Sequence, residues 1–231
     1  MNTEVTVDVA QLEAAERYLD PAKTRCLCHG RYSNTHGPER HLVWVCFDCT
    51  GSQSTSISPG GLGWWITRGS VLLGRSDCVH VQTMFWDHEK QQFYSYGADY
   101  ASGVYCNYLK TFEKPGWRFV QLDVTMAQEV ALRRALIAEV GKRFDLVSAL
   151  LIYFYPLPLG GTSWICSSLA AHALHAAGLT PNAPPAHVVT PARLLAYLDR
   201  EYPGLRTMLE NNLVVLSNSL KRNGRQNFYY V

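Results

Sequence analysis

Alternating apolar and polar residues mark the middle of the chain as a series of strands. Residues 117–124 alternate in this way, and residues 79–86 and 92–96 form two strand-like runs around the polar residues 87–90. Alternation places side chains of one kind on one face of a sheet, and a short polar segment between two such runs is typical of a hairpin. The sequence therefore predicts an antiparallel hairpin and one further strand.

The pattern becomes helical after residue 124. Thr125 is followed three residues later by Gln128, which is the spacing of a capping box, and Gly141 lies where the helix is expected to end, after about Val140. Three more helices are predicted, over residues 146–155, from 163 or 164 to 177, and from 190 to about 198. Strands first and helices later favour an α+β domain.

The N-terminal part of the chain differs from the rest in composition. Residues 6–19 predict a short amphipathic helix, and residues 24–51 contain four of the seven cysteines. Residues 51–63 are rich in glycine and serine and predict a turn-rich connector. We therefore expect an N-terminal segment over residues 1–55, with the helix and these cysteines, and a larger domain over residues 56–231.

Composition and charge exclude several classes of protein. Hydrophobic residues make up 47% and charged residues 17% of the chain, which excludes an intrinsically disordered protein. The formal net charge of +2 gives no basic surface for bulk nucleic-acid binding. The sequence has no apolar run of about 18 residues that predicts a transmembrane segment, and its acidic start has no signal-peptide core. We therefore expect a cytoplasmic, reducing compartment, where cysteines remain thiols or bind metal.

Two close pairs of cysteines lie in the N-terminal segment. Cys26 and Cys28 precede His29, and Cys46 and Cys49 follow with the two-residue spacing of a zinc knuckle. Four thiolates would complete a tetrahedral structural Zn²⁺ site, and the tight spacing of the first pair leaves His29 as a substitute ligand. Bound zinc would also fold a segment that has no core of its own. The competing interpretation is four free thiols near the surface.

Cys166 lies where the sequence predicts the first turn of a helix. There the unpaired backbone N–H groups and the positive end of the helix dipole favour the thiolate, which is the nucleophilic form of cysteine. The same N–H groups can stabilise the oxyanion that forms on an attacked carbonyl. The competing interpretation is a buried structural cysteine, which is common in protein cores.

His80 lies at the start of a predicted strand. A histidine at the edge of a strand can reach the N-terminus of a helix, where it would act as the base for Cys166. Most histidines in strands instead bind a backbone partner and have a structural role. From the residues alone both interpretations stay open.

Six short motifs follow one another in an order that resembles a known family. That family is the circularly permuted branch of the NlpC/P60 (papain-like) superfamily, in which a strand with a histidine precedes a helix with a cysteine. The resemblance covers roughly residues 64–200. Its motifs are Gly69–Leu73, His80-Val81, Trp117–Val124, Gly141–Asp145, Trp164–Leu169, and Ala177–Leu179 with Thr190–Leu194.

The resemblance implies a permuted papain-like fold, with an antiparallel sheet packed on helices, and a catalytic pair of Cys166 as nucleophile and His80 as base. It also implies a third polar residue, on the following strand, that orients the imidazole. Ser95 falls there when positions are counted along the hairpin, although a serine carries no charge. Two other residues are candidates for this orienting role. They are Gln82, which lies on the same strand face as His80, and Asp99.

Two residues beside the cysteine are candidates for binding substrate. Trp164 lies two positions before Cys166 and either lines a cleft or packs in the core, and Ser167 follows directly. Ser168 replaces the glutamate that is common in this branch of the family. That departure leaves a non-catalytic member as an alternative.

The function that the resemblance implies is a cysteine hydrolase that forms an acyl-enzyme on an amide, isopeptide or ester carbonyl. We expect a peptidase, isopeptidase or amidase that needs no cofactor for catalysis. Its partner would be a protein or peptide substrate, with ubiquitin-like proteins among the candidates. The alternatives are a papain-like protein-binding module without activity and a lipid-directed thiol acyl hydrolase or acyltransferase. The family is common in viruses, phages and bacterial effectors, so the cytoplasm of a host cell is a further expected location.

Overall fold

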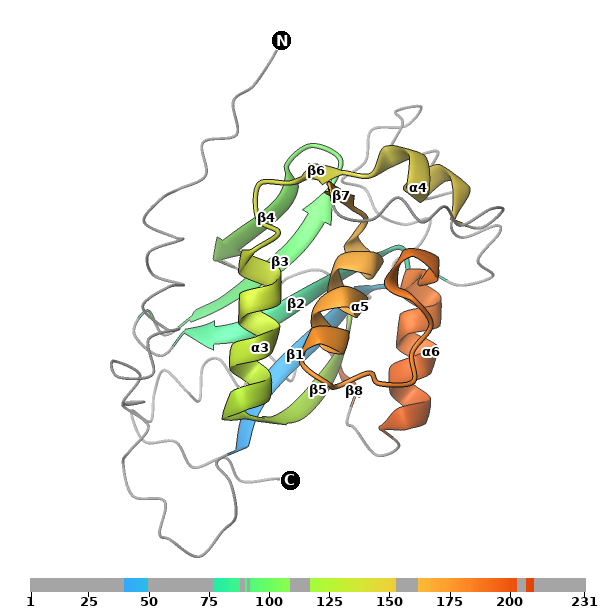
Figure 1. Cartoon of the computed structure of the whole chain (residues 1–231). Helices are drawn as coiled ribbons and strands as arrows, with labels where there is room; N and C mark the ends of the chain where they lie inside the picture. The colour runs from blue at the N-terminus through green and yellow to red at the C-terminus, as the bar shows by residue number, and fades with distance from the viewer. Residues whose placement is uncertain are drawn as a thin grey trace, which may run out of the picture.

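The computed structural model of the chain describes residues 40–49, 77–87, 90, 92–108, 117–152, 162–202 and 207–209 (Figure 1). These residues form a main antiparallel sheet packed against helices, together with a small parallel pair of strands, so the predicted α+β class is confirmed. Several predicted segments lie outside the described residues: the helix over 6–19, the connector over 51–63 and the motif over 69–73.

The main sheet has six strands in the order β4-β3-β2-β1-β5-β8, and every neighbouring pair runs antiparallel. The predicted hairpin is confirmed as β2 and β3, and the predicted strand after residue 116 is confirmed as β5. The strands are β1 (Arg40–Asp48), β2 (His80–Asp87), β3 (Gln92–Asp99), β4 (Gly103–Tyr108), β5 (Trp117–Thr125) and β8 (Thr207–Leu209).

Strand β1 lies between β2 and β5, at the centre of the sheet. No strand was predicted there, and these residues were assigned to the Cys-rich segment 1–55. Val43, Val45 and Phe47 are buried on one face of β1, and Trp44 and Cys46 are buried on the other. Residues 40–48 therefore belong to the same sheet as the strands over 80–125. The expected boundary between the N-terminal segment and the larger domain, at residue 55, falls between these parts of one sheet.

The helices begin and end at residues with identifiable local roles. Thr125 caps α3 (Met126–Ile137) in a capping box with Gln128, as predicted, and Thr190 caps α6 (Pro191–Glu201). Gly178, after α5 (Cys166–Ala176), has a φ of 68°, a left-handed conformation that glycine adopts without strain. The remaining elements are α4 (Leu146–Leu151), the 3₁₀ turn η2 (Ala186–Val188) and a two-stranded parallel pair, β6 (Arg143–Phe144) with β7 (Ser163–Trp164).

Helices α3 and α5 cover one face of the sheet (Figure 1). Leu132 and Leu136 of α3 and Leu169 of α5 join the larger hydrophobic core with residues from β1 to β5. A smaller cluster occupies the opposite face and contains Met84 and Trp117. Within the described part of the chain, no helix combines the length and apolarity needed to cross a membrane.

Candidate functional site at the start of helix α5

Cys166 is the first residue of α5, as the sequence predicted, and follows strand β7 directly after Ile165. The Ser168 hydroxyl accepts a hydrogen bond from the N–H of Ile165 and donates one to its carbonyl oxygen, which fixes the entry into the helix. Cys166 is only 9% exposed. The local sequence therefore places a thiol at a buried helix N-terminus.

The sulfur of Cys166 lies next to the start of β2. Strands β2 and β3 pair from Thr83 and Tyr96 onward, and before that point they diverge towards the N-terminal end of α5 (Figure 1). The N–H of Val81 donates a hydrogen bond to the Cys166 sulfur. Because Val81 directly follows His80, the fold brings the two predicted catalytic residues to the same end of the sheet.

Burial sets the protonation state of Cys166. Desolvation raises the pKa of this thiol to about 11, and the Asp99 carboxylate also acts to raise it. Hydrogen bonds from the backbone N–H groups of Val81, Ser167 and Cys166 itself act in the opposite direction. The resting group is therefore a thiol at neutral pH. The position at a helix N-terminus favoured the thiolate, and the competing interpretation was a buried structural cysteine; burial outweighs the helix N-terminus here.

His80 belongs to a hydrogen-bonded group on the other face of β2. The Gln82 amide nitrogen lies 3.2 Å from His80 Nε2 and donates to Tyr105 Oη at 2.8 Å. Tyr105 Oη is itself 3.5 Å from His80 Nε2. The His80 ring lies edge-on to Trp117, a member of the cluster on the face away from the helices. No hydrogen bond joins Cys166 to His80 in the described structure.

The register of the hairpin decides which candidate contacts the imidazole. Gln82, one of the two alternatives to Ser95, contacts the imidazole of His80. Ser95 pairs instead with Met84, four positions beyond His80 and so roughly 13 Å along the strand. Its hydroxyl is buried and has no hydrogen-bond partner in the described structure. Asp99 accepts hydrogen bonds from the backbone of the turn between β3 and β4.

Tyr105 is the residue of this group that sequence reasoning missed. It lies on β4 opposite Gly97 of β3, and its hydroxyl reaches across that glycine to Gln82 on β2. The signal for it was the glycine in the middle of β3, because a strand glycine often marks a place where another group approaches closely. No strand was predicted over the residues of β4, so Tyr105 could not be placed beside Gly97 from the sequence.

Trp164 and Ser167 hold α5 in place. The Trp164 indole N–H donates to the Glu139 carboxylate, and its ring packs 4.8 Å, between centroids, from the ring of His172. The Ser167 hydroxyl donates to the carbonyl oxygen of Val189 at 2.6 Å, and this serine is fully buried. The polar atoms of both predicted substrate-binding residues are thus engaged inside the protein.

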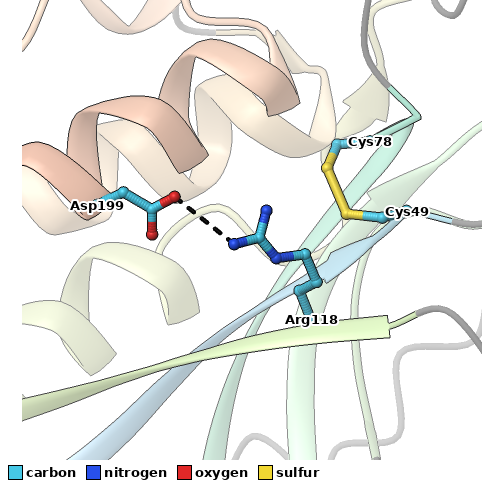
Figure 2. Close-up of a disulfide and its surroundings, with 4 residues drawn as sticks. All are labelled: Cys49, Cys78, Arg118 and Asp199. Atoms are coloured by element: carbon cyan, nitrogen blue, oxygen red, sulfur yellow. Dashed lines mark ion pairs between the residues drawn. A yellow bond between two sulfur atoms is a disulfide. The ribbon is translucent and has the colours of Figure 1, made fainter. Parts of the chain in front are cut away.

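The predicted zinc ligands of the second pair lie on different faces of the sheet. Cys46 is buried with its sulfur 3.9 Å from that of Met84. Cys49 lies on the helix side, where it forms a disulfide with Cys78 (Figure 2). This disulfide differs from the expectation of thiols or metal ligands, and it arises because antiparallel pairing of β1 with β2 brings the two residues together.

Zinc binding is not tested by the described residues. Cys26, Cys28 and His29 lie outside them, and within them no group of three or more histidine, cysteine, aspartate or glutamate side chains is arranged to hold a metal ion. With Cys49 in a disulfide, a site built from the four predicted cysteines lacks one ligand. The zinc site stays a prediction.

No protein-family model matches the chain. Comparison with curated proteins and with solved structures likewise gives no match. The resemblance to permuted NlpC/P60 proteins therefore stays a hypothesis. Several of its motif residues have local structural roles of their own: Asp145 caps α4, Gly178 follows α5 and Thr190 caps α6.

Proposed function

We propose that the protein is a cysteine-dependent acyl hydrolase of the peptidase, isopeptidase or amidase type, with Cys166 as its nucleophile. The observation that carries this proposal is the set of three backbone N–H groups directed at the Cys166 sulfur, two from the start of α5 and one from Val81. Such donors stabilise negative charge on sulfur and on an adjacent oxyanion. A permuted papain-like fold is part of the same proposal.

In the proposed reaction the Cys166 sulfur attacks the carbonyl carbon of a protein or peptide amide. The S–C bond forms as the thiol proton leaves for the imidazole of His80 and the carbonyl electrons move to oxygen. The oxyanion collapses, the C–N bond breaks and the leaving nitrogen takes the proton from His80. Water then hydrolyses the thioester. Because burial keeps Cys166 protonated, loss of its proton accompanies attack instead of preceding it.

A second candidate is a papain-like binding module without activity. Two observations favour it: burial raises the pKa of Cys166 to about 11, and no hydrogen bond joins Cys166 to His80 in the described structure. Under this alternative Cys166 is a core thiol, and its replacement by alanine leaves the biological role intact.

Acetylation by p-nitrophenyl acetate separates the two candidates. The hydrolase is expected to release a burst of p-nitrophenolate and to carry the acetyl group on Cys166, located by peptide mass spectrometry. Cys166→Ala should abolish the burst, and His80→Ala should slow it by about 100-fold or more, the usual contribution of a general base. Cys106→Ala is the matched control, because Cys106 is also a free cysteine, half-buried, and desolvation raises the pKa of its thiol too. Acetylation of Cys166 no faster than that of Cys106 would favour the binding module.

A further inference from the structure

The disulfide between Cys49 and Cys78 ties the end of β1 to the start of β2 (Figure 2). Strand β2 begins two positions after Cys78, at His80. Beside the disulfide, the Val79 N–H donates to the carbonyl oxygen of Asp48 at 2.8 Å, and Asp48 pairs with His80. Backbone hydrogen bonds at the end of a strand open more readily than those in its middle, so the covalent bond stabilises the pairing at this point.

The residues that follow the disulfide contact the N-terminal end of α5, which packs on β2. Val81, three positions after Cys78, is fully buried in the larger core together with Leu169 of α5. The N–H of Val81 donates a hydrogen bond to the sulfur of Cys166. The start of β2 therefore shields the Cys166 thiol, and its movement would change access to that thiol.

The two cysteines of the disulfide differ in their exposure. Cys78 is buried, with 5% of its surface exposed, whereas Cys49 is only partly buried against the larger core. Thiol–disulfide exchange requires a thiolate to contact one of the two sulfur atoms, so access selects the sulfur that is attacked. The Cys49 sulfur is therefore the one that an external thiol reaches.

Arg118 supplies a positive charge beside Cys49. It lies on β5 opposite Phe47 of β1, so Cys49, two positions further along β1, is its diagonal neighbour on the same face of the sheet. Such neighbours are about 7–8 Å apart. The Arg118 side chain is 40% exposed, and its ion pair with Asp199, at 3.6 Å, offsets only part of its charge (Figure 2). A cation at this place attracts an approaching thiolate and stabilises a thiolate on Cys49.

We propose that the Cys49–Cys78 disulfide is a reversible redox site that takes a dithiol as its reductant, and that its reduction exposes Cys166. A thiolate of the dithiol attacks the Cys49 sulfur, the Cys49–Cys78 bond breaks, and Cys78 leaves as a thiolate that takes a proton from solvent. The second thiol of the reductant then attacks the reductant's own sulfur in this mixed disulfide. This step releases Cys49, and the reductant becomes a cyclic disulfide. Two electrons pass from the dithiol to the protein, whose two cysteines end as thiols.

Reduction leaves the start of β2 held by non-covalent contacts alone, so it separates from α5 more often and the Cys166 thiol becomes accessible. This consequence requires only that Cys166 lies where the fold places it. It holds both for the hydrolase and for the binding module, so the inference does not depend on the proposed activity.

Reduction of the folded full-length chain by dithiothreitol, without denaturant, tests the site. After removal of the reductant under nitrogen, alkylation of Cys166 by iodoacetamide should be about tenfold faster than in the oxidised chain, because a strand end that loses its cross-link opens more often. Hydrogen exchange followed by mass spectrometry should be faster in peptides that contain residues 79–81. Cys106 is the internal control, because it is a free thiol on β4, two strands away from β2. Its alkylation should not change, and an equal rise at Cys106 would overturn the proposal.

The variant with both Cys49→Ser and Cys78→Ser separates loss of the disulfide from other effects of the reductant. Its Cys166 alkylation should be fast with or without dithiothreitol. Reoxidised wild-type chain gives the same comparison without any substitution, and its Cys166 should return to the slow rate. A disulfide that dithiothreitol leaves intact in the folded chain, or reduction that leaves Cys166 alkylation unchanged, would overturn the proposal.

Glutathione, a monothiol, identifies the sulfur that is attacked. Its adduct, trapped by alkylation and located by peptide mass spectrometry, should lie on Cys49, and an adduct on Cys78 would contradict the assigned point of attack. Arg118→Gln should slow reduction about threefold or more, because it removes the charge that attracts the thiolate. Arg118→Lys is the matched control, since it keeps the charge and should keep the rate. Equal rates in the two variants would exclude this role of Arg118.

Discussion

The sulfur of Cys49 is bonded to the sulfur of Cys78, although Cys49 is also one of the four predicted zinc ligands. One sulfur cannot serve in both roles, because zinc binds the thiolate form. The disulfide joins residues 29 positions apart, at the end of β1 and just before β2 (Figure 2). Close by, Arg118 of β5 forms an ion pair with Asp199 of α6 at 3.6 Å.

Cys49→Ala and Cys78→Ala should destabilise the chain equally under non-reducing conditions. Closing a loop of this length is worth about 3–4 kcal/mol in the free energy of unfolding, and either substitution removes the same bond. Urea denaturation measures the loss, and reductant should remove the difference from wild type. A loss confined to Cys49→Ala, together with one equivalent of bound zinc by elemental analysis, would favour the metal site instead.

Alkylation of Cys166 by iodoacetamide should depend on pH as expected for a buried thiol. Its pKa is raised to about 11, so the fraction present as thiolate increases about tenfold per pH unit through pH 10 instead of levelling near pH 9. The rate of modification of the Cys166 peptide, measured by mass spectrometry from pH 6 to pH 10, checks this. The urea-unfolded chain is the control and should level near pH 9. A plateau that begins below pH 8 in the folded chain would contradict the effect of burial.

Gly97→Ala should separate Tyr105 from Gln82. The added Cβ overlaps the Tyr105 hydroxyl, so the tyrosine has to move, at a cost of about 1–3 kcal/mol in stability for an overpacked site. Urea denaturation measures this cost. Gly178→Ala is a useful comparison, because no atom lies within 4 Å of its added Cβ and it lies outside the His80 group. It should destabilise α5 through its positive φ and leave acetylation in the folded fraction unchanged.

Trp164→Phe should reduce stability and leave substrate affinity unchanged. The phenylalanine keeps the aromatic packing but removes the indole N–H from the buried Glu139 carboxylate, which retains its contact with Lys142. Loss of one donor to a buried charged group costs about 1–3 kcal/mol. Urea denaturation measures this cost, and saturation of the acetylation rate with probe concentration measures affinity. A weaker affinity at unchanged stability would restore Trp164 to the list of substrate-binding residues.

The elements that the sequence predicted well are those with local signals. The hairpin of β2 and β3 has a polar turn between two apolar runs, and Thr125 and Thr190 are followed by helices that they cap. Strand β1 has no such signal, because it is buried on both faces and its central residues form a nearly continuous apolar run. Cys46 within β1 and Cys49 just after it favoured a metal-binding interpretation instead.

The geometry of the candidate site could be predicted only in part from the sequence. Cys166 at a helix N-terminus and Gln82 beside His80 follow from sequence spacing, and both are found. The separation of Cys166 from His80 depends on where β2 and β3 diverge, and the choice of Gln82 over Ser95 depends on the register between these strands. Neither the point of divergence nor the register is encoded within a few neighbouring residues. A shift of one residue in the register would move every side chain of a strand to the opposite face of the sheet. Tyr105 depends on β4, which pairs next to β3 beyond the predicted hairpin.

The central position of β1 bears on how the chain folds as it is synthesised. The ribosome releases residue 40 long before residue 125, with which it pairs, so the nascent chain exposes an apolar strand until β2 and β5 emerge. At about 5–20 residues per second this exposure lasts for several seconds, within which chaperones can bind. A fragment that begins at residue 56 would leave the edges of β2 and β5 unpaired, and such open edges promote aggregation.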